Sequence, residues 1–191
     1  MNVDKVKNSW AQSRAAFEAF STEENFNTLA AAAQALADAF GKGGKAIIAG
    51  NGGSACDAMH FAEEFTGRFR RDRRALPVIS CTDPAHITCV GNDYGFDDIF
   101  SRTVEAFAVP GDIFIAISTS GNSPNIIKAV AAAKAKGAKV VTLLGKGGGK
   151  LKGAGDYEFI VDAKLSDKVQ EVHMAVLHIL IEAVENLMFG L

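Results

Sequence analysis

The sequence predicts an α/β protein with three layers, α/β/α, around a five-stranded parallel sheet of the flavodoxin-like type, with an N-terminal helical extension. Short apolar runs alternate with segments of helix length, which is the pattern of parallel strands joined by helical crossovers. The runs are apolar almost throughout, as expected for strands covered on both faces. Two loops rich in glycine or serine directly follow such runs, where open α/β folds bind their ligands.

The N-terminal region is expected to be helical from about Val3 to Phe40, with a break near Phe20-Ser21-Thr22. Ser21-Thr22-Glu23-Glu24 has the pattern of a capping box before an alanine-rich run that ends at Gly41. This region, about residues 1–43, precedes the first strand and is expected to pack against another subunit. The chain as a whole, residues 1–191, is long enough for one substantial core and is expected to form a single domain.

The remaining elements follow from the alternation of apolar runs and helix-length segments. Strands are expected at Lys45–Ala49, Pro77–Cys81, Asp112–Ser118, Lys139–Leu144 and Tyr157–Val161. Helices are expected at Ser54–Phe69, Pro84–Val90, Asp98–Ala108, Pro124–Lys136 and Asp167–Leu187.

Composition excludes several classes of protein. Hydrophobic residues make up 48% of the chain and charged residues 22%, which excludes wholesale disorder. The formal net charge of -2 gives no reason to expect nucleic-acid binding. Cys56, Cys81 and Cys89 lack CxxC spacing and are expected to be reduced thiols. Since no signal-peptide core and no apolar run of membrane-spanning length is recognised, we expect a cytoplasmic protein without membrane attachment.

Two other segments are interpreted as surface features. The basic run from Arg68 to Arg74 is expected to be a solvated helix end and loop, with an arginine reaching an anionic ligand as the alternative. The glycine-rich stretch from Gly145 to Lys150 follows a strand. It is interpreted as a mobile connection, with a third anion-binding loop as the alternative.

The two loops that follow apolar runs are the strongest indication of a ligand. They are Gly50-Asn51-Gly52-Gly53-Ser54 and Ser118-Thr119-Ser120-Gly121-Asn122-Ser123. Glycines let backbone N–H groups approach an anion, a helix start adds positive potential, and serine hydroxyls donate further hydrogen bonds. One anion bound by two such loops indicates a phosphorylated small molecule.

A dinucleotide-binding site is the alternative interpretation of the first loop. The letters GNGGSA match G-x-G-x-x-A, and Asp83 lies near the end of the second strand, where a ribose-binding acid is expected. The several hydroxyls of the second loop favour a phosphate monoester instead. A P-loop is excluded because no Gly-Lys-Ser/Thr follows.

Four polar side chains on two predicted helices are candidates for chemistry. His60 and Glu64 are four residues apart and share one helix face, where they can form a surface pair, hold a divalent ion or supply a base. Gln170 and His178 lie on the last helix and can border one cleft. An apolar-flanked histidine such as His178 is either a satisfied core residue or a group that relays protons near neutral pH.

Asn92 and Asp93 lie in a turn-rich segment, Gly91 to Phe96, after the second strand and its helix. Such residues usually form local turn hydrogen bonds. The functional alternative is contact with sugar hydroxyls.

Taken together, these segments resemble the sugar isomerase (SIS) domain family, and within it the heptose-phosphate isomerases. The resemblance covers essentially the whole chain. It is carried by GNGGSACDAMHFAEEFTGRF from Gly50, HITCVGNDYGFDDIFSR from His86, ISTSGNSPNIIKA from Ile117 and QEVHMAVLHILIE from Gln170.

The resemblance implies conversion of D-sedoheptulose 7-phosphate to D-glycero-D-manno-heptose 7-phosphate through an enediol, the entry step to the heptose of bacterial lipopolysaccharide. It implies a homotetramer and one zinc ion per subunit, held by His60, Glu64, Gln170 and His178. Glu64 is expected to be the carbon base and His178 the acid/base for oxygen protons. Substrate contacts are expected from Asn51, Gly52, Gly53, Ser54, Glu64, Asn92, Asp93, Ser118, Thr119, Ser120, Ser123 and Gln170.

These expectations place the phosphate loops and the pair Glu64 and His178 in a single cleft. The main alternative is a non-catalytic SIS protein that binds the bacterial replication initiator, which would need no acid/base pair. A sugar-phosphate-sensing regulatory domain and a dinucleotide-dependent oxidoreductase are further alternatives.

Overall fold

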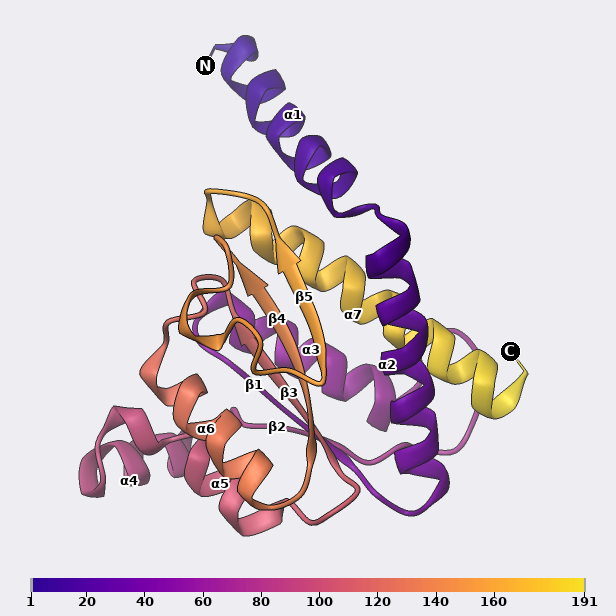
Figure 1. Cartoon of the computed structure of the whole chain (residues 1–191), viewed down its shortest axis with the longest axis vertical. Coiled ribbons are helices and arrows are strands. Elements are labelled where there is room, and N and C mark those ends of the chain that lie inside the picture. The colour runs from indigo at the N-terminus through magenta and orange to yellow at the C-terminus, as the bar shows by residue number, and fades with distance from the viewer. Residues whose placement is uncertain (1, 191) are drawn as a thin grey trace.

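The computed structural model describes residues 2–190 and has helices on both faces of a central sheet (Figure 1). All strand pairs are parallel, and the strand order is β2-β1-β3-β4-β5. The strands are β1 (Ala46–Gly50), β2 (Val78–Ser80), β3 (Ile113–Ser118), β4 (Lys139–Gly145) and β5 (Tyr157–Val161). Because this is the flavodoxin-like order, the predicted fold class is confirmed.

The helices lie close to the predicted positions. They are α1 (Val3–Phe20), α2 (Glu23–Gly41), α3 (Gly53–Thr66), α4 (Pro84–Asp93), α5 (Ser101–Phe107), α6 (Pro124–Ala135) and α7 (Ser166–Phe189), with short 3-10 turns at Phe96–Asp98 and Gly149–Leu151. The helix predicted to reach Phe69 ends at Thr66, where Gly67 donates its N–H to the carbonyl of Glu63. The helix predicted over 98–108 is a 3-10 turn followed by α5.

Two helix starts follow from capping side chains. The Thr22 hydroxyl accepts the N–H of Asn25 at 3.2 Å and begins α2, so the predicted break at Ser21-Thr22 is confirmed. The Asp83 carboxylate accepts the N–H of His86 at 2.7 Å and begins α4. Asp83 therefore has a local structural role as the N-cap of α4.

Alternate residues of each strand supply two separate cores. On one face of the sheet, Ile48 and Ile115 are buried beneath α2, α3 and α7. On the other face, Ile47 and Phe114 are buried beneath α5 and α6. The helices therefore cover both faces, and ligands can reach only the ends of the strands and the outer surface.

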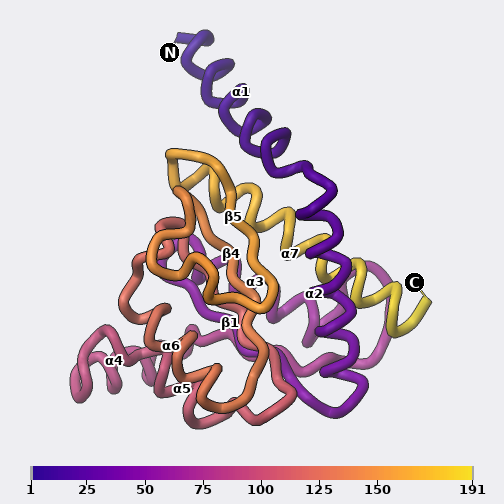
Figure 2. Tube along the Cα trace, in the orientation of Figure 1, coloured from indigo at the N-terminus to yellow at the C-terminus, as the bar shows by residue number. Residues whose placement is uncertain are grey.

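The first helix extends away from this body (Figure 2). In α1 only Ala16 and Phe20 are buried, whereas Val3, Val6 and Trp10 are exposed. The last helix, α7, is long and apolar enough to cross a membrane by length and composition, so the expectation that no segment reaches this length is wrong. Its apolar side chains pack against α2, α3 and the sheet as part of the core.

Candidate functional site

Glycines shape the first loop. A Cβ on Gly50 would lie 2.6 Å from the carbonyl oxygen of Ser54, so the chain can turn sharply from β1 into α3 only with glycine there. Gly52 has a φ of +58° at the N-cap of α3. A Cβ on Gly53 would meet the Gln170 side chain at 2.8 Å. The loop therefore brings the backbone N–H groups of the α3 N-terminus to the carboxyl edge of the sheet.

The second loop links the end of β3 to the start of α6 through its own hydroxyl groups. The hydroxyls of Ser118 and Ser123 are 3.1 Å apart, and Ser118 also accepts the N–H of Gly121. Ser123 is the N-cap of α6, but its hydroxyl makes no capping hydrogen bond. A helix N-terminus beside several hydroxyls makes a suitable anion site.

Side chains from the two loops and from α7 join this edge into one unit. Asn51 and Asn125 exchange two hydrogen bonds, at 2.9 and 2.8 Å, which connect the first loop to α6. Gln170 donates from Nε2 to the hydroxyl of buried Ser54 at 3.3 Å. Thr119 donates to Ser166, the first residue of α7, at 3.4 Å. The structure therefore places both predicted phosphate loops and Gln170 side by side.

The glycine-rich stretch from Gly145 to Lys150 packs against the second loop. The N–H of Lys150 donates to the Asn122 side chain, and Leu151 donates to the carbonyl of Gly121. A Cβ on Gly121 would overlap the carbonyl of Gly148. The interpretation of this stretch as a mobile connection is therefore wrong, because close backbone contacts hold it in place.

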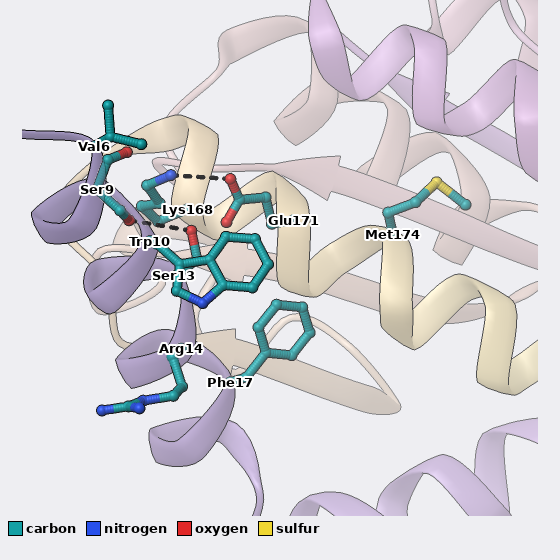
Figure 3. A pocket seen from close by; sticks show the side chains of 9 residues that line it. All are labelled: Val6, Ser9, Trp10, Ser13, Arg14, Phe17, Lys168, Glu171 and Met174. Atoms are coloured by element: carbon teal, nitrogen blue, oxygen red, sulfur yellow. Dashed lines mark hydrogen bonds and ion pairs between the residues drawn. The ribbon is translucent and has the colours of Figure 1, made fainter. Parts of the chain in front are cut away.

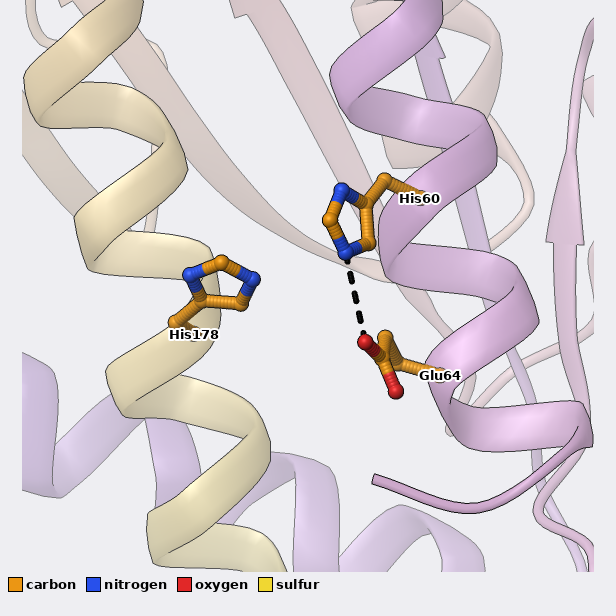
Figure 4. Close-up of side chains that lie close together, drawn as sticks. All are labelled: His60, Glu64 and His178. Atoms are coloured by element: carbon orange, nitrogen blue, oxygen red, sulfur yellow. Dashed lines mark hydrogen bonds and ion pairs between the residues drawn. The ribbon is translucent and has the colours of Figure 1, made fainter. Parts of the chain in front are cut away.

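The second part of the candidate site is a group of three side chains on α3 and α7 (Figure 4). One ligand atom from each of His60, Glu64 and His178 lies within 4.8 Å of the others. His60 Nε2 is 3.2 Å from Glu64 Oε1, and the two imidazole rings meet edge to face with centroids 5.1 Å apart. Glu64 is mostly buried, at 16% side-chain exposure. The carboxylate and the imidazole predicted to perform acid/base chemistry thus lie together.

This group also fits a zinc ion. Two imidazoles and one carboxylate form a donor set found in catalytic zinc sites, which leave a fourth position open for water or substrate. Gln170, the fourth predicted ligand, lies eight residues before His178 on α7. That separation is about 12 Å along a helix, and the Gln170 side chain contacts Gly53 and Ser54 at the first loop.

Asp57 adds a partly buried carboxyl beside this group. It precedes His60 by one helical turn, and its Oδ2 is buried without a hydrogen-bond partner among the described residues. Burial raises the pKa of Asp57 to about 6, an effect that His60 partly opposes. Asp57 is not among the predicted site residues, although its spacing from His60 places both on one helix face.

Asn92 and Asp93 lie apart from the loops. They are the last two residues of α4, not part of a turn as expected, because α4 continues to Asp93. Both are exposed, and Asn92 donates to Asp93 at 2.8 Å. Within the described part of the chain, neither forms a hydrogen bond to either loop.

Within one chain, the His60–Glu64–His178 group lies farther along α3 and α7 than the loops, with Glu64 close to the end of α3. The first loop follows the carboxyl end of β1, whereas the end of α3 lies near the amino edge, where Leu76 donates to the carbonyl of Phe65. The eleven-residue separation of Gly53 and Glu64 corresponds to about 16 Å of helix. The sequence predicts a single cleft without assigning its residues to one subunit, and that cleft stays a prediction.

Asn125 is a residue of this site that sequence reasoning also missed. It is 2% exposed and bonds to Asn51 through both its oxygen and its nitrogen. Its position directly after Ser123-Pro124, at the N-terminus of a predicted helix, was the available signal.

Comparisons with known proteins agree with this architecture. The family model described as the SIS domain matches residues 10–145. A phosphoheptose isomerase of Fusobacterium nucleatum is 68% identical over 157 residues, covering 82% of this chain and 81% of the relative. That of Escherichia coli is 50% identical over 188 residues, covering 97% and 98%. A solved phosphoheptose isomerase from Francisella tularensis superposes with a TM-score of 0.92 at 34% identity, covering 97% of this chain and 100% of that chain.

Proposed function

The chain belongs to the SIS domain family and, within it, to the phosphoheptose isomerases, and on this premise we propose that it interconverts D-sedoheptulose 7-phosphate and D-glycero-D-manno-heptose 7-phosphate. This reaction would be the first step of ADP-heptose synthesis for lipopolysaccharide. The observation that carries the proposal is the meeting of Glu64 and His178 from two helices. A non-catalytic SIS protein that binds the replication initiator would need no such pair, and the named relatives support the enzyme.

Ketose–aldose exchange moves one proton between neighbouring carbons. The Glu64 carboxylate removes the proton from C1, the electron pair forms the C1–C2 double bond, and the C2 oxygen takes a proton from His178. In the second half, Glu64 returns its proton to C2 while His178 takes back the proton of the C1 hydroxyl. A positioned acid and base of this kind typically contribute about 10²–10⁴ in rate.

The phosphate end of the substrate is assigned to the two loops. The second loop carries the hydroxyls of Ser118, Ser120 and Ser123 and leads into the N-terminus of α6, and charge-assisted hydrogen bonds to a phosphate are the strong ones. The remaining contacts are assigned by family resemblance to Asn51, Gly52, Gly53, Ser54, Asn92, Asp93, Thr119 and Gln170.

One zinc ion per subunit is proposed for the group on α3 and α7. His60, Glu64 and His178 would hold it, since their donor atoms already lie within 4.8 Å of one another. When bound, it supplies a Lewis acid for the negative charge of the enediolate. Because metal ligation lowers the basicity of a carboxylate, Glu64 would serve as the base with the ion held loosely by that side chain.

A complete site is proposed to need two copies of the chain. From phosphorus to the C2 carbonyl the substrate has seven bonds, which at extended-chain spacing reach about 8 Å. The separation of Gly53 and Glu64 in one chain is about 16 Å. The Glu64 side chain leans toward the N-terminus of α3, but this shortens the difference between the two distances only in part. The loops of one copy would therefore face Glu64 and His178 of another, and Gln170 of that first copy would complete the zinc site.

Helix α1 supports an oligomer of this kind, which we propose to be a homotetramer. With α7 it lines a groove of about 770 Å³ that includes Val6, Trp10, Phe17 and Met174 (Figure 3). Trp10 is 76% exposed and Val6 50% exposed. Large apolar side chains gathered on one projecting helix are typical of an interface. A self-complementary contact through this groove would bury them.

We further propose a cytoplasmic protein without nucleic-acid or membrane partners. A cytoplasmic location fits the free thiols Cys56, Cys81 and Cys89 and the packing of α7 within the core. The protein is expected to act on a sugar phosphate without nucleic-acid or membrane partners, in line with its small net charge.

The test of the function is incubation of the protein with sedoheptulose 7-phosphate in D2O, followed by NMR. We expect the aldose to form with deuterium at C2, because the carbon-bound proton exchanges with solvent on the base. Absence of the aldose would refute the isomerase. Formation of the aldose without deuterium would instead contradict a base that exchanges its proton with solvent.

A further inference from the structure

The arginine-rich segment from Gly67 to Arg74 lies along one face of α7. The Phe69 ring stacks on His178 with centroids 5.7 Å apart and an interplanar angle of 25°. Arg70 pairs with Glu182 at 2.6 Å, and Arg73 pairs with Glu185 at 2.8 Å. The three α7 partners have i, i+4, i+7 spacing, which is one face of a helix. Much of this segment is therefore a strap across α7, and its interpretation as a solvated loop is wrong for Phe69 and Arg73.

Arg73 ends helix α3 as well as pairing with α7. Its side chain is 2% exposed, and one terminal nitrogen donates to the carbonyl of Glu64 at 2.6 Å. The other terminal nitrogen donates to the carbonyls of Phe65 and Gly67. Carbonyls in the last turn of a helix lack partners within the helix, and a cation stabilises that end. One guanidinium thus connects the backbone of Glu64 to the helix that carries His178.

Phe69 acts on the imidazole of His178 directly. The ring of His178 lies between the face of Phe69 and the ring of His60, which it meets at 78°. Phe69 and His60 both lie outside α7, the helix that carries His178. Their rings therefore restrict how the imidazole can rotate relative to α3. His178 makes no hydrogen bond with any described residue that would orient it otherwise.

We propose that Phe69 and Arg73 are positioning residues, which set the distance and orientation between Glu64 and His178 by fixing the imidazole and the end of α3. This inference rests on the proposed isomerase function. A purely stabilising role explains the Arg73–Glu185 pair less well, because a buried ion pair often stabilises no more than apolar residues of similar size. The directed hydrogen bonds of the guanidinium favour a role in geometry.

The first test compares Phe69→Leu with Phe189→Leu. Phe189 is also half-buried and lies under an arginine, Arg74, at the far end of α7, so both variants lose a similar aromatic contact. We expect Phe69→Leu to lower kcat by about 10-fold to 100-fold with KM changed by less than about twofold. Phe189→Leu should keep the parental kcat, although it lowers the Tm by as much as Phe69→Leu does. A parental kcat in Phe69→Leu overturns the proposal.

Arg73→Lys provides the second variant. Lysine keeps the charge opposite Glu185 but lacks the planar fork that reaches the α3 carbonyls. We expect kcat to fall by about 10-fold or more while KM stays near the parental value. A Lys variant with parental kcat contradicts the positioning role of Arg73.

A readout independent of activity uses ¹³C-histidine labelling of the metal-free protein. The chain contains only four histidines, and the His178 signal is assigned by its loss in His178→Gln. In Phe69→Leu we expect the His178 ring signal to move downfield, because the aromatic ring current is removed, while Phe189→Leu leaves it in place. An unmoved signal in Phe69→Leu overturns the inference. If Phe69→Leu shifts the His178 signal but the parent protein fails to isomerise the heptose phosphate, only the proposed function is refuted.

Discussion

Asn51 and Asn125 exchange two side-chain hydrogen bonds, with each amide donating to the carbonyl of the other at 2.9 and 2.8 Å. The pair joins the loop after β1 to the helix that follows β3. Because the two strands are neighbours in the sheet, this contact sets the spacing of the two loops that are assigned to the substrate phosphate.

We expect Asn125→Ala to raise KM by about 10-fold, since loss of one amide leaves buried polar groups of the other unpaired at about 1–3 kcal/mol. Steady-state kinetics measure this effect. Urea unfolding of Asn51→Ala, Asn125→Ala and the double variant then gives the interaction free energy between the two side chains. We expect it to be about 1–2 kcal/mol. Strictly additive free energies of unfolding would show that the exchange contributes nothing.

Glu64→Gln should lower kcat by about 10³-fold or more with substrate binding retained, because glutamine keeps the shape and loses the base. Ser120→Asp should abolish binding, because its charge repels the phosphate. Neither single variant is expected to isomerise the substrate. Their separate defects make them suitable for testing whether one site uses two copies of the chain.

When the two variants are co-expressed, sites built from two chains should recover about one quarter of the parental activity by random assembly. Such a site takes its loops from one copy and Glu64 from the other. Sites built within one chain recover none. Activity of the mixture no higher than that of the separate variants would therefore refute the two-copy site.

Removal of the metal should inactivate the enzyme, with zinc restoring activity. Zinc should also raise the Tm of chelator-treated protein, because a ligand that binds only the folded state stabilises it. In His60→Gln, which lacks one imidazole ligand, we expect the zinc-dependent rise in Tm to shrink strongly. Full activity after complete removal of zinc would contradict an essential role for the ion.

His173 should make the protein sensitive to acid. Its ring is fully buried, Nε2–H donates to the carbonyl of Leu144 at 3.0 Å, and Nδ1 has no partner among the described residues. Burial lowers the pKa of His173 from 6.5 to about 4. The unfolded chain therefore binds a proton that the folded chain does not. The stability that this histidine contributes is present above pH 6.5 and is lost as the pH falls toward 4.

Between pH 7 and pH 5 this linkage amounts to about 2 kcal/mol in the free energy of unfolding. Urea unfolding at the two pH values measures it. His173→Gln, a neutral side chain that can still donate to Leu144, should flatten the dependence by that amount. An identical slope in parent and variant would show that His173 does not titrate on unfolding.

Much of this protein could be predicted from its sequence because the signals are local. Apolar runs alternate with helix-length segments, and α2 begins next to the predicted break, with Thr22 as its N-cap in place of the Ser21–Glu24 capping box. Gly50 of the first loop is needed by a contact within the same turn, because a Cβ there would meet Ser54. His60 and Glu64 share a helix face because four residues make about one turn.

Only the tertiary structure decided which distant residues meet. His178 reaches His60 because α7 packs beside α3, and Phe69 reaches His178 because the strap crosses α7. The same packing separates Glu64 from the phosphate loops, since α3 runs from the carboxyl edge of the sheet to the amino edge. Sequence spacing sets which face of a helix a residue occupies. Which other element packs against that face depends on how the whole chain buries its apolar surface.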